Sequence, residues 1–320
     1  MTAGQLEQAV GGELDRTAPE GARELAAELA GRGGSSTALV LYYGSALRAE
    51  NLEGILDFYV LLDDVAAWPQ TAAARLANRW LPPNVGYFEM VRGEQVLRAK
   101  FAVLSRAQFA QRLRTTSIDT TIWARFSQPA LLAWSRSATD RNATIELVAD
   151  AVGCAASWAA RLGPRSGRAD EFWRALFART YAAELRVEKQ ARAQDIVGKA
   201  AERYAALLPL AWQRAGIRHR RDPDGVLTTE IPEAERKQAS SSWAWRQRLG
   251  RPLNMLRLLK AAFTFEGAMD YAAWKIERHS GVHIEVTPWQ RRFPLLAAPG
   301  LYLKLRREGV LRSGGTGRAP

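Results

Sequence analysis

The sequence has almost no cysteine or histidine. The single Cys154 among 320 residues excludes a disulfide framework and a cysteine-rich zinc module, and it favours a reducing compartment. Only His219, His279 and His283 could serve a histidine-based metal site or a catalytic triad. His279 and His283 have i,i+4 spacing, but Gly281 between them argues against a shared helix face and hence against a metal role.

Long apolar runs are absent as well. No stretch of about 18 consecutive apolar residues occurs, which predicts no membrane-spanning helix. Residues 1–23 contain acids, glycines and a proline in place of the basic flank and apolar core of a targeting signal, so we expect none. Apolar residues make up 47% of the chain and charged residues 24%, as is usual for a folded globular protein. We expect a soluble or peripheral protein.

Basic charge is concentrated near the C-terminal end. Residues 241–320 contain 14 Lys or Arg and 5 Asp or Glu, whereas the whole chain has a net charge of +12. The first 240 residues therefore contribute only a small part of that charge. A basic end on a near-neutral body predicts an anionic surface as partner, and composition alone does not choose between lipid headgroups and nucleic acid.

The most informative stretch is residues 39–64. An apolar run ends in Gly44-Ser45, and after a turn-rich connector a second apolar run contains one acid, Asp57. A carboxylate inside a strand-like apolar run is costly to bury unless something binds it. A Gly-Ser pair at a strand end leaves backbone N–H groups able to approach a phosphate closely. The pattern predicts a nucleotidyltransferase, with a phosphate-binding turn followed by a metal-binding acid one strand later.

This strand lacks the expected second carboxylate. A nucleotidyltransferase strand carries acids at positions i and i+2, because the two-residue period aims both at one metal site. Tyr59 holds the i+2 position here. Asp63 falls on the same face as Asp57 but would lie roughly 20 Å along a continuous strand. We therefore assign Asp63 and Asp64 to the turn at the strand end and expect the second ligand from elsewhere in the chain.

Patterning along the chain predicts an α+β fold, with strands in its first third and helices beyond. The expected strands are residues 38–43, 55–62, 85–92 and 96–104. From Ser105, a good N-cap, to about residue 208 the sequence is almost wholly helical in character, with short interruptions. Residues 215–242 are expected to be a loop or linker, followed by helices at 253–264 and 268–278.

Four regions follow from this pattern. They are an N-terminal helical extension, a nucleotidyltransferase-like mixed-sheet core, a mostly helical domain and a basic amphipathic C-terminal region with a membrane-surface contact, covering residues 1–36, 37–110, 111–240 and 241–320.

Four charged residues in the body of the chain have two interpretations each. Lys100 lies in the middle of a strand, where it could contact a triphosphate or lie at a sheet edge in solvent. Arg125, Glu184 and Arg186 fall on expected helices, and residue type alone favours a solvated helix face for each of them.

The C-terminal tail has the composition of an interfacial membrane segment. The candidate membrane contacts are Trp289, Arg291, Arg292, Phe293, Lys304, Arg306 and Arg307. Each basic residue near an anionic bilayer contributes about 1 kcal/mol, so several could hold a peripheral protein there. The alternative is ordinary packing, with the charged ends of the side chains extended into water.

Six short motifs occur in the order found in one known family. They are Tyr43-Gly44-Ser45; Leu56-Asp57-Phe58 with Asp63-Asp64 and Trp68; Lys100-Phe101-Ala102-Val103-Leu104-Ser105; Arg125 with Gln128-Pro129; Tyr181-Ala182-Ala183-Glu184-Leu185-Arg186; and Lys260 to Thr264 with Tyr271 and Trp274-Lys275. From about residue 39 to 278 the chain resembles the mitochondrial-type phosphatidate cytidylyltransferases, which are peripheral CDP-diacylglycerol synthases, and their bacterial relatives.

The resemblance implies a nucleotidyltransferase domain followed by a helical domain, with CTP and Mg²⁺ held between them. A lipid phosphate oxygen would attack the α-phosphorus of CTP, and pyrophosphate would leave. The resemblance assigns the metal to Asp57, with Glu184 as the candidate second ligand. It assigns the nucleotide phosphates and their charge to Tyr43, Gly44, Ser45, Lys100, Arg125, Arg186 and Lys260.

The chain departs from the family pattern at three positions. It has Pro69, Gln128 and Ala46 where the family has His, Lys and Gly. We expect a magnesium-dependent cytidylyltransferase acting on phosphatidate or another lipid phosphate, cytoplasmic and peripheral on the inner face of the membrane, with no nucleic-acid partner. The alternatives are a nucleotidyltransferase acting on RNA or protein, and a non-catalytic relative that binds anionic lipid.

Overall fold

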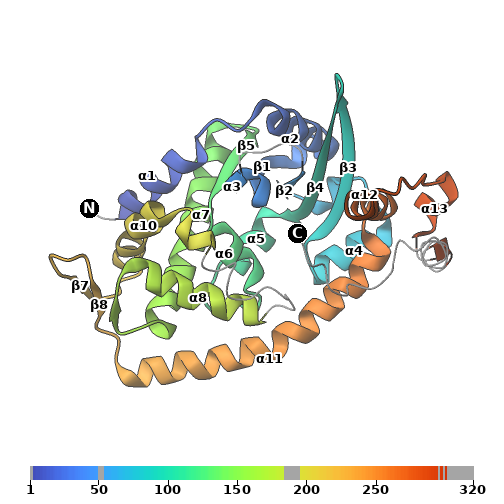
Figure 1. The fold of residues 1–320 in the computed structure, drawn as a ribbon. Helices are drawn as coiled ribbons and strands as arrows, with labels where there is room; N and C mark the ends of the chain where they lie inside the picture. Colours follow the sequence, from blue (N-terminus) through green and yellow to red (C-terminus); the bar gives the residue numbers. More distant parts are fainter. Residues whose placement is uncertain (1–2, 50–53, 184–194, 295, 298–299, 301–320) are drawn as a thin grey trace, which may run out of the picture.

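The computed structural model describes residues 3–49, 54–183, 195–294, 296–297 and 300, and it has an α+β fold (Figure 1). A five-stranded mixed sheet has the strand order β3-β4-β2-β1-β5. The pair β2 and β4 is parallel, and the other neighbours are antiparallel. The strands are Thr37–Tyr43 (β1), Ile55–Leu62 (β2), Asn84–Arg92 (β3), Gln95–Ser105 (β4) and Ala130–Ser135 (β5).

Helices lie on both faces of this sheet and form a second, mostly helical part beside it (Figure 1). A small sheet of β6 (Ser166–Gly167), β8 (Leu227–Thr229) and β7 (His219–Arg221) joins the helical part. The helices are α1 (Ala3–Leu14), α2 (Glu20–Gly33), α3 (Ser45–Ala49), α4 (Ala72–Trp80), α5 (Arg106–Arg112), α6 (Thr121–Phe126), α7 (Ala138–Leu162), α8 (Ala169–Ala183), α10 (Ala201–Arg214), α11 (Glu233–Thr264), α12 (Ala268–Ser280) and α13 (Pro288–Arg292).

Alternating side chains of β1 and β2 build two cores. Leu39 and Tyr59 are buried with residues of α5, α6 and α7. Val40 and Phe58, on the opposite face of the sheet, are buried with residues of α2. The two-residue period of a strand thus explains why nearly every position of β1 and β2 is apolar: both faces are covered.

Strand β5 corrects the expectation of an almost wholly helical stretch after Ser105. It pairs antiparallel with β1, so that Ala130 lies opposite Tyr43 and Leu132 opposite Leu41. Alanine and leucine, which are good helix formers, dominate its sequence, so local propensity gives no strand signal there. Pairing with a buried strand overrides that propensity. The four expected strands are confirmed, as is the N-cap at Ser105, which forms a capping box with Gln108.

Helix α11 is a second difference. Part of residues 215–242, expected to be a linker, belongs to this helix, which begins at Glu233 and continues through Gly250 and Pro252 to Thr264. It runs along one edge of the molecule from the helical part to the sheet (Figure 1). It packs on α7 and α8 near its start and on α4 and β3 near its end. Contacts at both ends explain why the helix persists through two helix-breaking residues.

Among the described residues, α7 is the one helix long and apolar enough to cross a membrane by length and composition, and most of it is buried inside the protein. A buried core helix passes the same test.

Candidate functional site

One row of residues crosses the sheet where β1 ends. Asp57 lies opposite Tyr43 of β1 on one side and opposite Lys100 of β4 on the other. Lys100 in turn lies opposite Tyr87 of β3. Directly opposed residues share a face of the sheet. The register therefore places the acid and the lysine, which lie 43 positions apart in the sequence, side by side.

Gly44 makes room for the carboxylate of Asp57. Its φ of +103° is a conformation that residues with side chains rarely adopt. A Cβ atom built on Gly44 would lie 2.6 Å from Oδ2 of Asp57. The glycine is thus required both for the turn into α3 and for the close approach of the carboxylate, which the sequence pattern alone did not reveal.

A cavity of about 210 Å³ lies over this row. Cationic side chains outnumber the acid around it: Arg48, Lys100 and Arg125 line it together with Asp57. Its other lining residues are Tyr43, Gly44, Ser45, Thr121, Ala124, Gln128, Thr180 and Tyr181. The sheet edge, α3, α6 and α8 therefore form one polar compartment, which we call the polar cavity. Its charge suits an anion with several oxygens.

Tyr59 has a definite role at the position where a second acid was expected. Its hydroxyl accepts a hydrogen bond of 2.6 Å from Nη1 of Arg125. The guanidinium also lies over the rings of Tyr43 and Tyr59, at 5.3 and 5.6 Å from their centroids. The i+2 position of β2 thus positions a cation at the cavity instead of binding a metal ion.

A second cavity, of about 510 Å³, adjoins the first and is mostly apolar; we call it the apolar cavity. Four residues line both cavities: Tyr43, Lys100, Thr121 and Arg125. About half of the remaining wall comes from α11, α12 and the residues between them, including Leu258, Phe265 and Tyr271. The amine of Lys100 lies 5.5 Å from the centroid of Tyr271. Lys100 and Arg125 therefore lie at the boundary between a polar and an apolar compartment.

An ion cluster around Asp119 fastens α11 to this site. Arg257 pairs with the Asp119 carboxylate and donates to Oγ1 of Thr121 at 3.3 Å. Arg112 lies 3.5 Å from the same carboxylate. Burial by itself would raise the pKa of Asp119, but Arg257 and the backbone N–H of Thr121 hold it below its ordinary value. No local sequence pattern predicts this cluster.

Lys260, expected to bind nucleotide, lies in the wall of the apolar cavity and not in that of the polar cavity. Its amine donates to the carbonyl oxygens of Leu81 (2.7 Å) and Pro83 and to Oδ1 of Asn84 (3.0 Å). Burial and the charges of Arg257 and Arg112 lower its pKa to about 8. These bonds tie α11 to the chain between α4 and β3.

The structure describes only part of the expected membrane segment. Trp289 of α13 and Phe293, the residue after this helix, are exposed, and the guanidinium of Arg292 lies 5.9 Å from the ring centroid of Phe293. Arg291 instead pairs with Asp270 of α12 at 2.9 Å. The other expected residues, Lys304, Arg306 and Arg307, lie outside the described residues, as do Glu184 and Arg186.

The donor set restricts how a metal could bind. Among the described residues, no group of three or more His, Cys, Asp or Glu side chains could hold an ion. Asp57 is the one carboxylate lining the polar cavity in the part of the chain that the structure describes. Mg²⁺ at nucleotide sites is commonly held by one or two carboxylates together with substrate phosphates. Asp57 fits that arrangement as a single protein ligand.

Two groups at the site were not predicted from the sequence. Arg48 lies one turn after the Gly-Ser pair, and its Nη1 is 3.4 Å from Oε1 of Gln128. Its proximity to Gly44-Ser45 in the sequence was an available signal. The Asp119–Arg257 pair joins residues 138 positions apart, and no local pattern indicates it. The expected turn role of Asp64 is confirmed, since its side chain accepts from the backbone N–H of Ala66 at 2.8 Å.

No protein-family model matches this chain, and no curated protein matches it. Among solved structures, it is similar to the crystal structure of a nucleotidyltransferase-like protein from Exiguobacterium sibiricum. The two are 13% identical, with 93% of this chain and 96% of that chain covered and a TM-score of 0.27. A likeness at this TM-score says nothing of activity, so function is inferred from the residues of the two cavities.

Proposed function

We propose that this protein is a nucleotidyltransferase that transfers CMP from CTP to phosphatidate or another lipid phosphate. The observation that carries the proposal is the boundary between the two cavities. Lys100 and Arg125 line a polar cavity on one side and an apolar cavity on the other. A reaction between a nucleotide triphosphate and the phosphate of an amphipathic acceptor needs such a boundary, where the two phosphates meet.

The polar cavity suits the nucleotide. Three cations and one carboxylate surround it, so its charge opposes that of a triphosphate. Gly44 brings the backbone close to the Asp57 carboxylate, and Ser45 follows at the start of α3. Lys100 and Arg125 at the boundary would neutralise the α-phosphate and the attacking phosphate together.

In the proposed reaction an acceptor phosphate oxygen forms a bond to the α-phosphorus of CTP. The bond between the α-phosphorus and the bridging oxygen breaks, and pyrophosphate leaves with the electron pair. Arg48, Lys100 and Arg125 would hold the two anions together and offset their repulsion. Asp57 would hold Mg²⁺ against the phosphates, where the ion supplies Lewis-acid stabilisation of the leaving group. The preference for CTP comes from the motif resemblance.

The test uses CTP labelled at the α-phosphate, Mg²⁺ and phosphatidate in mixed micelles. We expect a labelled CDP-lipid and pyrophosphate in equal amounts. Asp57→Asn should lower kcat at least about a hundredfold, because the carboxylate that the described residues contribute to the polar cavity is lost. Asp64→Asn is the matched control, since Asn also caps the turn at the far end of β2, and it should keep full activity.

No product with any lipid phosphate tried would remove the enzymatic claim. Full activity of Asp57→Asn would remove Asp57 from the reaction. RNA and protein acceptors are tested in the same assay, and their labelling in place of lipid would change the acceptor class.

One observation favours a second candidate, a non-catalytic protein that binds anionic lipid and nucleotide. Tyr59 holds Arg125 where a nucleotidyltransferase strand has a second acid. Equilibrium binding of CTP with and without Mg²⁺ separates the two. Binding that is unaffected by the metal and is accompanied by no turnover would favour the non-catalytic protein.

A further inference from the structure

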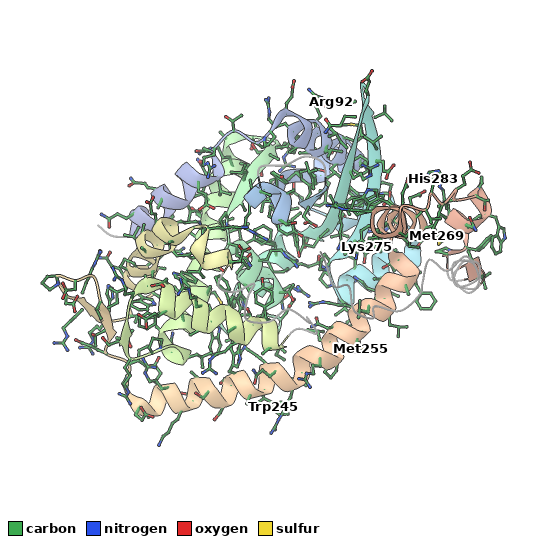
Figure 2. All side chains as sticks on the ribbon, in the orientation of Figure 1. Arg92, Trp245, Met255, Met269, Lys275 and His283 are labelled. Carbon is green, nitrogen blue, oxygen red and sulfur yellow. The ribbon has the colours of Figure 1, made fainter. Side chains whose placement is uncertain are left out.

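Helix α11 carries an apolar stripe on the side that faces away from the protein. The stripe consists of Trp245, Leu249, Pro252, Leu256, Leu259 and Phe263. The spacing of four, three, four, three and four residues puts all six on one side of a helix. Its five large side chains are between 38% and 72% exposed, and Met255 beside them is also exposed. Figure 2 shows Trp245 and Met255 along the outer edge of this helix.

The other side of α11 is already occupied. Trp243 is buried between Trp123 and Trp158, with ring centroids 6.3 and 5.3 Å away. Further along, Arg257 and Lys260 bind Asp119 and the chain after α4. The stripe is therefore not needed to hold α11 on the protein, and its exposure leaves an unpartnered apolar face.

Helix α4, which packs on α11, also carries exposed apolar side chains. Leu76 and Trp80 are 59% and 78% exposed. The two helices pack on each other, and Lys260 of α11 donates to the carbonyl of Leu81, the residue after Trp80. We call the exposed apolar residues of α4 and of α11 from Trp245 onward, with the exposed arginines among them, the outer face.

Charge decides what can cover the outer face. From Trp245 onward α11 has no acidic side chain, and its exposed basic residues there are Arg248 and Arg251. Helix α4 has two arginines, Arg75 and Arg79, and no acid. A second copy of this chain would bring like charges together, whereas an anionic bilayer offers opposite charge and an apolar interior.

We propose that the outer face docks on an anionic lipid bilayer. Leu258, which is exposed, also lines the apolar cavity, so docking places that cavity beside the lipid surface. The inference that an acceptor lipid passes from the bilayer into this cavity rests on the proposed function. The docking itself depends only on the exposed residues. It assigns the main contact to α4 and α11, upstream of the tail expected from the sequence.

The test measures cosedimentation of the full chain with vesicles of phosphatidylcholine and phosphatidylglycerol, without nucleotide. The variant Leu256→Ser/Leu259→Ser/Phe263→Ser should bind at least about tenfold more weakly, because three exposed apolar contacts are lost. Arg248→Glu/Arg251→Glu should lose binding in the same way without changing the stripe. The matched control, Trp289→Ser/Phe293→Ser in α13 and at the residue after it, should stay within about twofold of the unmodified protein.

Unchanged binding of both α11 variants would overturn the proposal, as would equal binding to vesicles of phosphatidylcholine alone. A dimer in solution that the serine variant dissociates would assign the outer face to a second copy instead. Turnover of a short-chain, water-soluble lipid phosphate separates the two proposals. Turnover without vesicle binding would support the proposed function and overturn the docking. Vesicle binding without turnover would support the docking and overturn the proposed function.

Discussion

The two faces of α11 reverse the usual arrangement of a surface helix. On its inner face Arg246 donates to the carbonyl oxygen of Ser117 at 3.0 Å, and Arg257 and Lys260 bind partners around the apolar cavity. On its outer face most large side chains are apolar and exposed. Cations fasten the helix where it crosses between the helical part and the sheet, because directional bonds to fixed oxygens set its position. The apolar residues remain available to something outside the protein.

The largest expected effect is the loss of an inner cation. Arg257→Leu leaves the buried Asp119 without its closest partner, and breaking a buried pair in this way costs about 3–5 kcal/mol of unfolding free energy. Arg251→Leu, on the exposed side of the same helix, should change that free energy by no more than about 0.5 kcal/mol. Urea unfolding measures both. Equal losses of unfolding free energy in the two variants would show that the inner cations do not hold α11 on the protein.

Two tryptophans of α11 test whether its faces differ in burial: Trp243 lies on the inner face and Trp245 on the outer face. Trp243→Ala should cost about 3 kcal/mol, because a buried ring between Trp123 and Trp158 is removed. The value lies at the low end for tryptophan because Nε1 of Trp243 has no hydrogen-bond partner to lose. Trp245→Ala should change stability by no more than about 0.5 kcal/mol. Thermal unfolding of both variants measures these changes in stability. A large loss of stability in Trp245→Ala would show that Trp245 is buried in a core.

The smallest expected effect is a pH dependence at Lys260. Its pKa is about 8 in the folded protein, against about 10.4 for an unperturbed lysine. Between these values the unfolded state binds more protons, so stability rises with pH. From pH 7 to 9 the protein should gain about 1 kcal/mol relative to Lys260→Met, which has no proton to lose. Parallel pH profiles of the two proteins would contradict the assigned burial of this amine.

The sequence was most informative where neighbouring positions carry the signal. The strand with Asp57 and the turn at Gly44 could be placed because alternation and turn chemistry act over a few residues. The fold class followed from the same local patterns. Strand β5 could not be predicted, because its alanines and leucines become a strand only when β1 offers an edge.

The rest of the site depends on pairings that no local rule contains. Arg125 is bound by Tyr59, 66 positions earlier, and residue type alone assigned it to a solvated helix face. The sequence has Tyr59 where a nucleotidyltransferase strand has a second acid. In the structure the hydroxyl of Tyr59 accepts a hydrogen bond from Arg125. Lys260 was expected at the nucleotide, but its charge is committed to three oxygens near the end of α4.

The two cavities are lined by different parts of the chain, which affects the order in which they can form during synthesis. The described residues that line the polar cavity are all present once residue 181 has been synthesised, whereas the apolar cavity needs residues up to Tyr271. Because chains fold progressively as they emerge, a partly made chain could form the first compartment well before the second. Until α11 crosses the molecule, a nascent chain would present the polar cavity without the apolar cavity beside it.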